Sequence, residues 1–164
     1  MANIKCKYCN KIIKDEPYKY KNTNYCGETC ANLHEKQKKN RVALTDYIQE
    51  IYLENGYEKD EINWTLITSM LKNIQQEHKD WNDAQIRYVL FYMYEIIQVN
   101  LFDEKSNGSI LALLPFYFNE ARDFCKKQKE IKDAVNEFEF DDEVIVIKRN
   151  NNRRYWDDID IGGL

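Results

Sequence analysis

Residues 6–30 read CKYCNKIIKDEPYKYKNTNYCGETC and hold four of the five cysteines of the chain. The cysteines form two close pairs, Cys6 with Cys9 and Cys26 with Cys30, and sixteen residues lie between the pairs. Two such pairs joined by a short loop supply four thiolates that can converge on one tetrahedral zinc ion. The spacing therefore predicts one structural Zn²⁺ site. Two disulfides in an exported protein are the other interpretation of the same residues.

The residues around these pairs predict a knuckle, a hairpin and a helix, in that order. Residues 11–25 alternate between apolar and polar positions, with a break at 15–17, and this pattern predicts a short β-hairpin. A helical pattern begins at Glu28 and places Cys30 in its first turn, where free N–H groups favour a thiolate. His34 lies four residues later on the same face. We interpret it as a surface or outer residue, and as a ligand only if it replaces a cysteine.

The stretch YCGETCA at residues 25–31 resembles the ending YCSxxCA of small treble-clef zinc fingers of the TRASH and MYM type. The resemblance covers the first quarter of the chain and implies that the four paired cysteines bind zinc. Such fingers bind DNA, RNA or proteins, so the resemblance does not select the ligand. The body, residues 64–138, resembles small uncharacterised proteins of phages of Gram-positive hosts, with LALLPFYFNEARDF at 111–124 as the marker.

Charge is distributed unevenly along the chain. Residues 1–41 contain ten Lys and Arg against four Asp and Glu, whereas acids are in excess over both 42–136 and 137–164. Local basic charge interleaved with tyrosines is typical of nucleic-acid contact. The residues expected to contact phosphate are Lys7, Lys11, Lys36, Lys38, Lys39 and Arg41. A solvated helix face that complements the helix dipole is the simpler interpretation of the last four.

Apolar residues at helical spacing predict helices over 42–55, 64–79, 83–99 and 115–138. The pattern leaves open whether the first of these is continuous with the helix that begins at Glu28. Three signals indicate the helix ends: Asn63 as a cap, Asn82 with Gln85 as a capping box, and Asn55-Gly56 as a stop. The expected apolar stripe of the last helix is Tyr117, Ala121, Phe124, Ile131 and Val135. Cys125 in that helix is expected to be a core residue.

The C-terminal residues differ in character from the helices. The run Val144–Ile147 predicts a short strand, and 155–164, YWDDIDIGGL, alternates apolar residues with aspartate. This alternation is typical of a docking peptide. The residues expected to bind a protein partner are Tyr155, Trp156, Asp157, Asp158, Ile159, Ile161 and Leu164. Alternatively, this tail folds back on its own helices, with Trp156 as the anchor.

These patterns predict a mainly α fold, with a small treble-clef finger joined to a bundle of about four helices and a short C-terminal strand and tail. The expected domains are a zinc finger at 1–41, a helical domain at 42–137 and the strand and tail at 138–164. The sequence does not indicate an oligomeric state. It contains no apolar run long enough to cross a membrane and no apolar signal segment, so we expect a cytoplasmic protein, in the host cytoplasm if it is phage-encoded.

Sequence motifs of common enzymes are absent. The chain has no HExxH, GxSxG, Walker or dinucleotide glycine motif, and a four-sulfur zinc site leaves no position open for water. We therefore expect a non-enzymatic accessory protein of a phage or bacterium that contacts nucleic acid through the finger and proteins through the acidic body and tail. The alternatives are an adaptor or host-enzyme inhibitor with a purely structural zinc, and a nuclease-like enzyme built on a treble clef.

Overall fold

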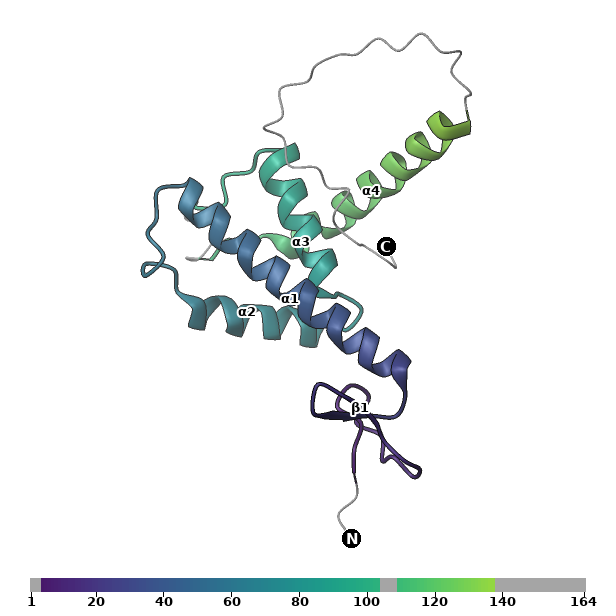
Figure 1. Cartoon of the computed structure of the whole chain (residues 1–164). Coiled ribbons are helices and arrows are strands. Elements are labelled where there is room, and N and C mark those ends of the chain that lie inside the picture. Colours follow the sequence, from purple (N-terminus) through teal and green to yellow (C-terminus); the bar gives the residue numbers. More distant parts are fainter. Residues whose placement is uncertain (1–3, 104–108, 138–164) are drawn as a thin grey trace. The chain divides into compact units, whose positions relative to one another are not determined.

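A computed structural model of the chain describes residues 4–103 and 109–137, and its elements are labelled in Figure 1. This part is mainly helical, with a two-stranded hairpin near the N-terminus, which confirms the predicted fold class. The elements are, in order, β1 Tyr18–Tyr20, β2 Thr23–Tyr25, α1 Glu28–Glu54, α2 Trp64–Glu77, α3 Asp83–Phe91, the π-helix η1 Tyr92–Ile96, and α4 Leu114–Glu137. The predicted C-terminal strand and the partner-binding residues of 155–164 lie outside the described residues.

The fold divides into two compact units, Met1–Ile51 and Tyr52–Leu164, here called the cysteine unit and the helical unit. The sequence predicted a boundary at 41/42, whereas this division falls inside α1. Because α1 runs from Glu28 to Glu54, the helix that begins at Glu28 and the helix predicted at 42–55 are one continuous helix. The apolar side chains expected on that helix are all buried: Leu44, Tyr47, Ile48, Ile51 and Tyr52.

The hairpin is antiparallel, with Tyr18 opposite Tyr25 and Tyr20 opposite Thr23. A two-residue turn joins the strands, and both of its residues, Lys21 and Asn22, have positive φ angles of 47° and 59°. Such a turn matches the twist of a hairpin, although glycine usually occupies it. The break predicted at 15–17 is not the turn. The sequence expectation was wrong on this point because a lysine gives no signal for a left-handed backbone.

Two of the predicted helix ends are confirmed at the start of α2 and α3. The side chain of Asn63 accepts a hydrogen bond from the N–H of Leu66 at 3.0 Å. Asn82 and Gln85 form a complete capping box, with distances of 3.0 and 2.8 Å. At the end of α1, Gly56 has a φ of +85°, as the stop at Asn55-Gly56 requires.

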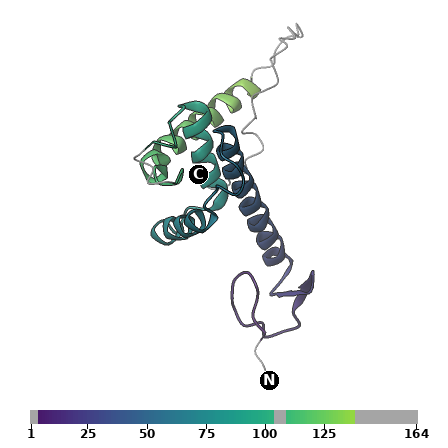
Figure 2. The same ribbon diagram turned by 90° about the vertical axis from the view of Figure 1, so that its left-hand side faces the viewer.

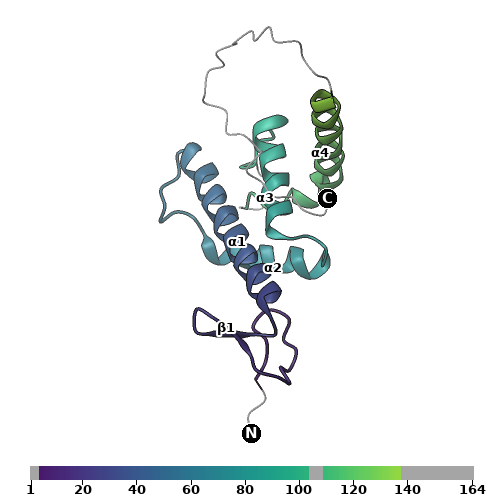
Figure 3. The same cartoon turned by 45° about the vertical axis from the view of Figure 1, so that its right-hand side comes forward.

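The helix predicted over 83–99 is shorter than expected and changes type. It is α-helical to Phe91, continues as the π-helix η1 to Ile96, and ends before Gln98, which has a φ of 53°. α3 is buried along almost its whole length, as its apolar sequence indicated. Figures 1 and 3 show α3 and α4 side by side within the helical unit.

Packing of α4 also differs from the prediction. The buried side chains are Leu114, Phe118, Ala121 and Cys125, whereas the predicted stripe residue Ile131 is 56% exposed. The ring of Phe118 stacks on Trp81, with centroids 3.6 Å apart, and Trp81 stacks in turn on His78. The stripe prediction is confirmed at Ala121 and wrong at Ile131, because it assumed that the whole helix is covered, while among the described residues only the first half is buried.

Candidate metal centre

A tight loop presents the first cysteine pair. The backbone N–H of Cys6 donates to the carbonyl of Lys11 at 2.9 Å, and that of Asn10 donates to the carbonyl of Cys6 at 3.0 Å. Asn10 has a φ of 57°, a conformation that asparagine tolerates better than most residues. The N–H of Lys7 donates to the carbonyl of Asn24 at 3.0 Å, which ties this loop to β2. The loop is thus held both within itself and to the hairpin.

The second pair lies where β2 passes into α1. Cys26 follows the last residue of β2, and Cys30 lies in the first turn of α1, as predicted. Figure 2 shows the hairpin and the loop that precedes it at the N-terminal end of α1. The first N–H groups of a helix have no carbonyl partner within it, so this position favours negative charge on sulfur.

All four sulfur atoms, from Cys6, Cys9, Cys26 and Cys30, lie within 4.8 Å of one another. The sulfurs of Cys9 and Cys26 are 3.7 Å apart, and those of Cys26 and Cys30 are 3.2 Å apart. A zinc–sulfur distance of about 2.3 Å places the sulfurs of a tetrahedral site about 3.8 Å apart. The cluster therefore fits a metal ion such as zinc, and it forms a zinc-finger-like site beside a hairpin and a helix.

Two thiols of this cluster, those of Cys6 and Cys30, have strongly shifted pKa values. Burial opposes ionisation of Cys6, but hydrogen bonds from the backbone N–H groups of Cys9, Cys26 and Tyr8 lower its pKa to about 6. The hydrogen bond with Cys26 and burial raise the pKa of Cys30 to about 12. One thiolate is thus stabilised by the protein, while further thiolates beside it need a cation. A metal ion such as Zn²⁺ would supply that cation and bind the deprotonated sulfurs.

The hydrophobic core around the cluster is small. Cys6, Tyr25 and Ala31 form its buried part, and the side chains packed against them are Cys9, Ile13, Tyr20 and Cys30. Cysteines thus make up much of the core themselves. A core of this size is too small to stabilise a fold alone, so metal binding and folding are expected to be coupled in this unit.

His34 is not part of the sulfur cluster, in agreement with its interpretation as an outer residue. Its Nδ1 is 2.8 Å from the hydroxyl of Tyr25, the residue just before Cys26. Its ring also lies near those of Tyr25 and Tyr8, with centroid distances of 5.7 and 6.5 Å. The spacing of His34 from Cys30 indicated a shared helical face, but the sequence did not indicate the tyrosine partner.

The predicted phosphate-binding residues lie in two separate segments of the cysteine unit. Lys7 and Lys11 lie in the first cysteine loop, whereas Lys36, Lys38, Lys39 and Arg41 lie on α1. The five lysines are exposed and Arg41 is half-buried. The sequence did not indicate a role for Glu35. Its carboxylate forms ion pairs with Lys21 at 2.9 Å and with Lys38 at 3.5 Å. The hydrogen bond from Lys21 lowers the pKa of Glu35. Part of the basic charge is therefore neutralised.

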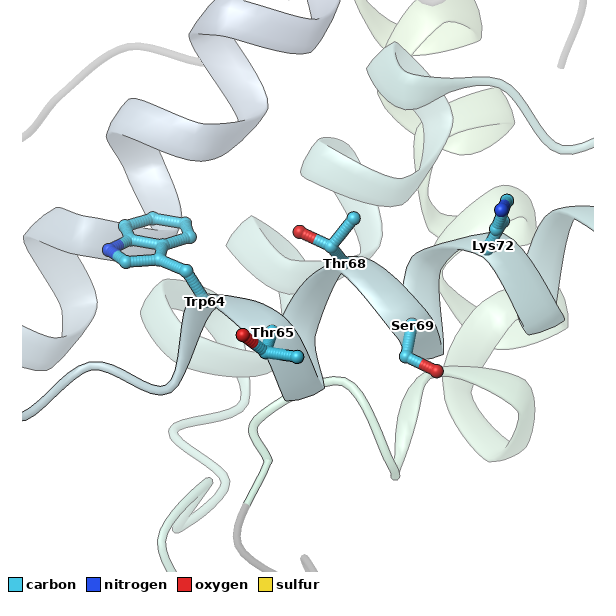
Figure 4. A pocket seen from close by; sticks show the side chains of 5 residues that line it. All are labelled: Trp64, Thr65, Thr68, Ser69 and Lys72. Carbon is cyan, nitrogen blue, oxygen red and sulfur yellow. The ribbon is translucent and has the colours of Figure 1, made fainter.

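An open hollow of about 510 Å³ lies along the exposed side of α2. The residues that line it are Trp64, Thr65, Thr68, Ser69 and Lys72 (Figure 4). No carboxylate, histidine or cysteine is among these lining residues. No helix in the described part of the chain is both long and apolar enough to cross a membrane.

No protein-family model matches the chain, and comparison with curated proteins and with solved structures finds no similar protein. The resemblance to treble-clef fingers therefore rests on the sequence of residues 6–31 and on the hairpin and helix that carry the cysteines. The conclusion that the geometry supports directly is a metal-binding cysteine cluster on a small unit of its own.

Proposed function

We propose that the chain is a zinc-stabilised, non-enzymatic binding module of the treble-clef type. Four cysteine sulfurs at tetrahedral spacing complete the coordination of one Zn²⁺ and leave no position for a water or a substrate. Catalysis by such an ion would require an open position. The ion is then structural, and function belongs to the surface that it holds in shape.

The proposed ligand of the cysteine unit is nucleic acid. The observation that carries this proposal is the excess of basic side chains in residues 1–41, ten Lys and Arg against four Asp and Glu, with all nine lysines exposed. Among the described residues, Lys7 and Lys11 make no ion pair, and both belong to the loop that holds Cys6 and Cys9. Unpaired lysines of this kind can exchange counterions for phosphate.

Fluorescence anisotropy with labelled DNA and RNA tests this proposal. Binding should weaken steeply between about 50 and 200 mM salt, because each phosphate contact releases a counterion. The triple variant Lys36→Gln, Lys38→Gln, Lys39→Gln should lose affinity and reduce the salt slope. A matched control is Lys126→Gln, Lys127→Gln, Lys129→Gln, which removes the same charge from exposed positions of α4. Absence of salt-sensitive binding, or equal losses in the two variants, would contradict the proposal.

A protein partner is the second proposed ligand, as for an adaptor or host-enzyme inhibitor encoded by a phage or bacterium. The observation that favours it is exposed apolar surface on α4, where Phe116 is 78% and Ile131 is 56% exposed. Candidate partners can be captured with the full chain and compared with Phe116→Ser and with a chain that ends at residue 154. Loss of one defined partner with either variant would locate its contact, and retention with both would contradict this second role.

A further inference from the structure

Four aromatic side chains lie close to the metal cluster in the cysteine unit, and two of them, Tyr8 and Tyr18, are exposed. Tyr8 lies beside His34, and His34 lies beside Tyr25, with centroid distances of 6.5 and 5.7 Å. Tyr18 is opposite Tyr25 in the hairpin, so the two side chains share one face of it. Tyr25 is buried in the centre, whereas Tyr8 and Tyr18 are 37% and 39% exposed.

The two exposed tyrosines are held by different parts of the unit. Tyr8 lies in the tight loop between Cys6 and Cys9, and Tyr18 begins β1. Each precedes or follows an exposed lysine in the chain, Lys7 beside Tyr8 and Lys19 beside Tyr18. Neither lysine makes an ion pair with another described residue. Each exposed tyrosine therefore has an unpaired lysine next to it in the chain, with Lys19 on the opposite face of the hairpin from Tyr18.

We propose that the nucleic acid bound by this unit is single-stranded, with Tyr8 and Tyr18 stacking on unpaired bases and Lys7 and Lys19 contacting the phosphates. This inference rests on the proposed function and narrows its ligand. Unpaired bases expose their faces and can stack on aromatic side chains, whereas the faces of paired bases in a duplex are covered by their neighbours. Duplex binding would use the lysines alone.

The test uses the zinc-loaded full chain and one fluorescein-labelled strand, offered alone and annealed to its complement, as DNA and as RNA. The wild type should bind the single strand more tightly than the duplex at equal salt. Tyr8→Leu with Tyr18→Leu removes both aromatic surfaces, and each lost stack should weaken single-strand binding about tenfold. Duplex binding by this variant should remain within about twofold, because it depends on charge.

Two further variants separate stacking from folding. Tyr8→Phe with Tyr18→Phe keeps both rings and should retain single-strand affinity. Phe116→Leu removes an exposed aromatic ring from the helical unit and should have no effect. Zinc content of one ion per chain in each variant shows that the unit is intact. Equal affinity for the single-stranded DNA probe and the single-stranded RNA probe would indicate that the protein does not contact the 2′-hydroxyl.

The outcomes distinguish this inference from the proposed function. Salt-sensitive binding that favours the duplex, or equal losses on both probes in the leucine variant, would overturn the single-strand inference and leave the nucleic-acid role intact. Failure of the phenylalanine variant to retain binding would also overturn it. Absence of salt-sensitive binding to every probe would overturn both.

Discussion

The hydroxyl of Tyr25 lies 2.8 Å from Nδ1 of His34, and this bond joins the end of β2 to the second turn of α1. The two residues flank the second cysteine pair, one just before Cys26 and the other four residues after Cys30. The bond thus holds together the two elements that present these sulfurs. It is an outer contact that orients the metal site without binding the ion.

Removing this bond should weaken the metal site. Tyr25→Phe leaves His34 without its partner, and the loss of about 1 kcal/mol should lower zinc affinity about fivefold. Competition with a chromophoric chelator measures the change. Tyr18→Phe is the matched control, because the Tyr18 hydroxyl has no hydrogen-bond partner among the described residues. Equal affinity in the wild type and Tyr25→Phe would show that the bond does not support the site.

Zinc content should depend on the four clustered cysteines and not on the fifth. Cys6→Ser, or the same change at Cys9, Cys26 or Cys30, should abolish retention of one Zn²⁺ per chain, since a serine hydroxyl is a poor zinc ligand. Cys125→Ser should retain the ion, because Cys125 is buried in α4 and lies outside the cluster. Mass spectrometry of the metal after dialysis gives the count. Zinc retained by a cluster variant would contradict the ligand assignment.

Metal removal should unfold the cysteine unit selectively. The buried core around the metal cluster consists of Cys6, Tyr25 and Ala31, so the hairpin depends on the ion. Hydrogen exchange with mass spectrometry, with and without a chelator, should show loss of protection over Tyr18–Tyr25. Protection in α3 should persist, because its core is independent of the cysteines. Unchanged exchange in the hairpin would show that it folds without metal.

Zinc affinity should increase with pH. The pKa of Cys30 is raised to about 12, chiefly by its hydrogen bond with Cys26, so at neutral pH zinc must displace its proton. The pKa of Cys26 is also raised: the bond with Cys30 lowers it, but those with Cys9 and Cys6 outweigh this effect. Two displaced protons give about a hundredfold gain in affinity per pH unit. Chelator competition between pH 6.5 and 8 measures the slope, and a flat profile would contradict it.

Stability of the helical unit should depend on the cap of α3. Asn82→Ala removes the side-chain oxygen that accepts the hydrogen bond from the N–H of Gln85 and should lower the free energy of unfolding by about 1 kcal/mol. Asn73→Ala makes the same change at an exposed interior position of α2 and should be neutral or slightly stabilising. Urea unfolding followed by circular dichroism compares the two. Equal effects would show that the cap does not contribute.

Local signals in the sequence were read correctly where neighbouring residues alone determine the structure. Asn82 and Gln85 are three residues apart, and a capping box needs nothing more. The buried face of α1 from Leu44 to Tyr52 follows from helical periodicity in the same way. The turn at Lys21 and Asn22 was missed because tertiary context, and not residue preference, holds Lys21 at positive φ. Ile131 was misassigned because periodicity gives a face but does not show whether another element covers it.

The sequence by itself determined the four cysteines of the metal centre, the hairpin-and-helix order around them and the helical character of the rest. These follow from spacing and periodicity, which are local properties of a chain. Only the tertiary structure decided that the four sulfurs meet within 4.8 Å, that Tyr25 pairs with His34, and that Glu35 takes up charge from Lys21. Each of these contacts joins segments that the fold alone brings together, and the chain's pattern contains no signal for such distances.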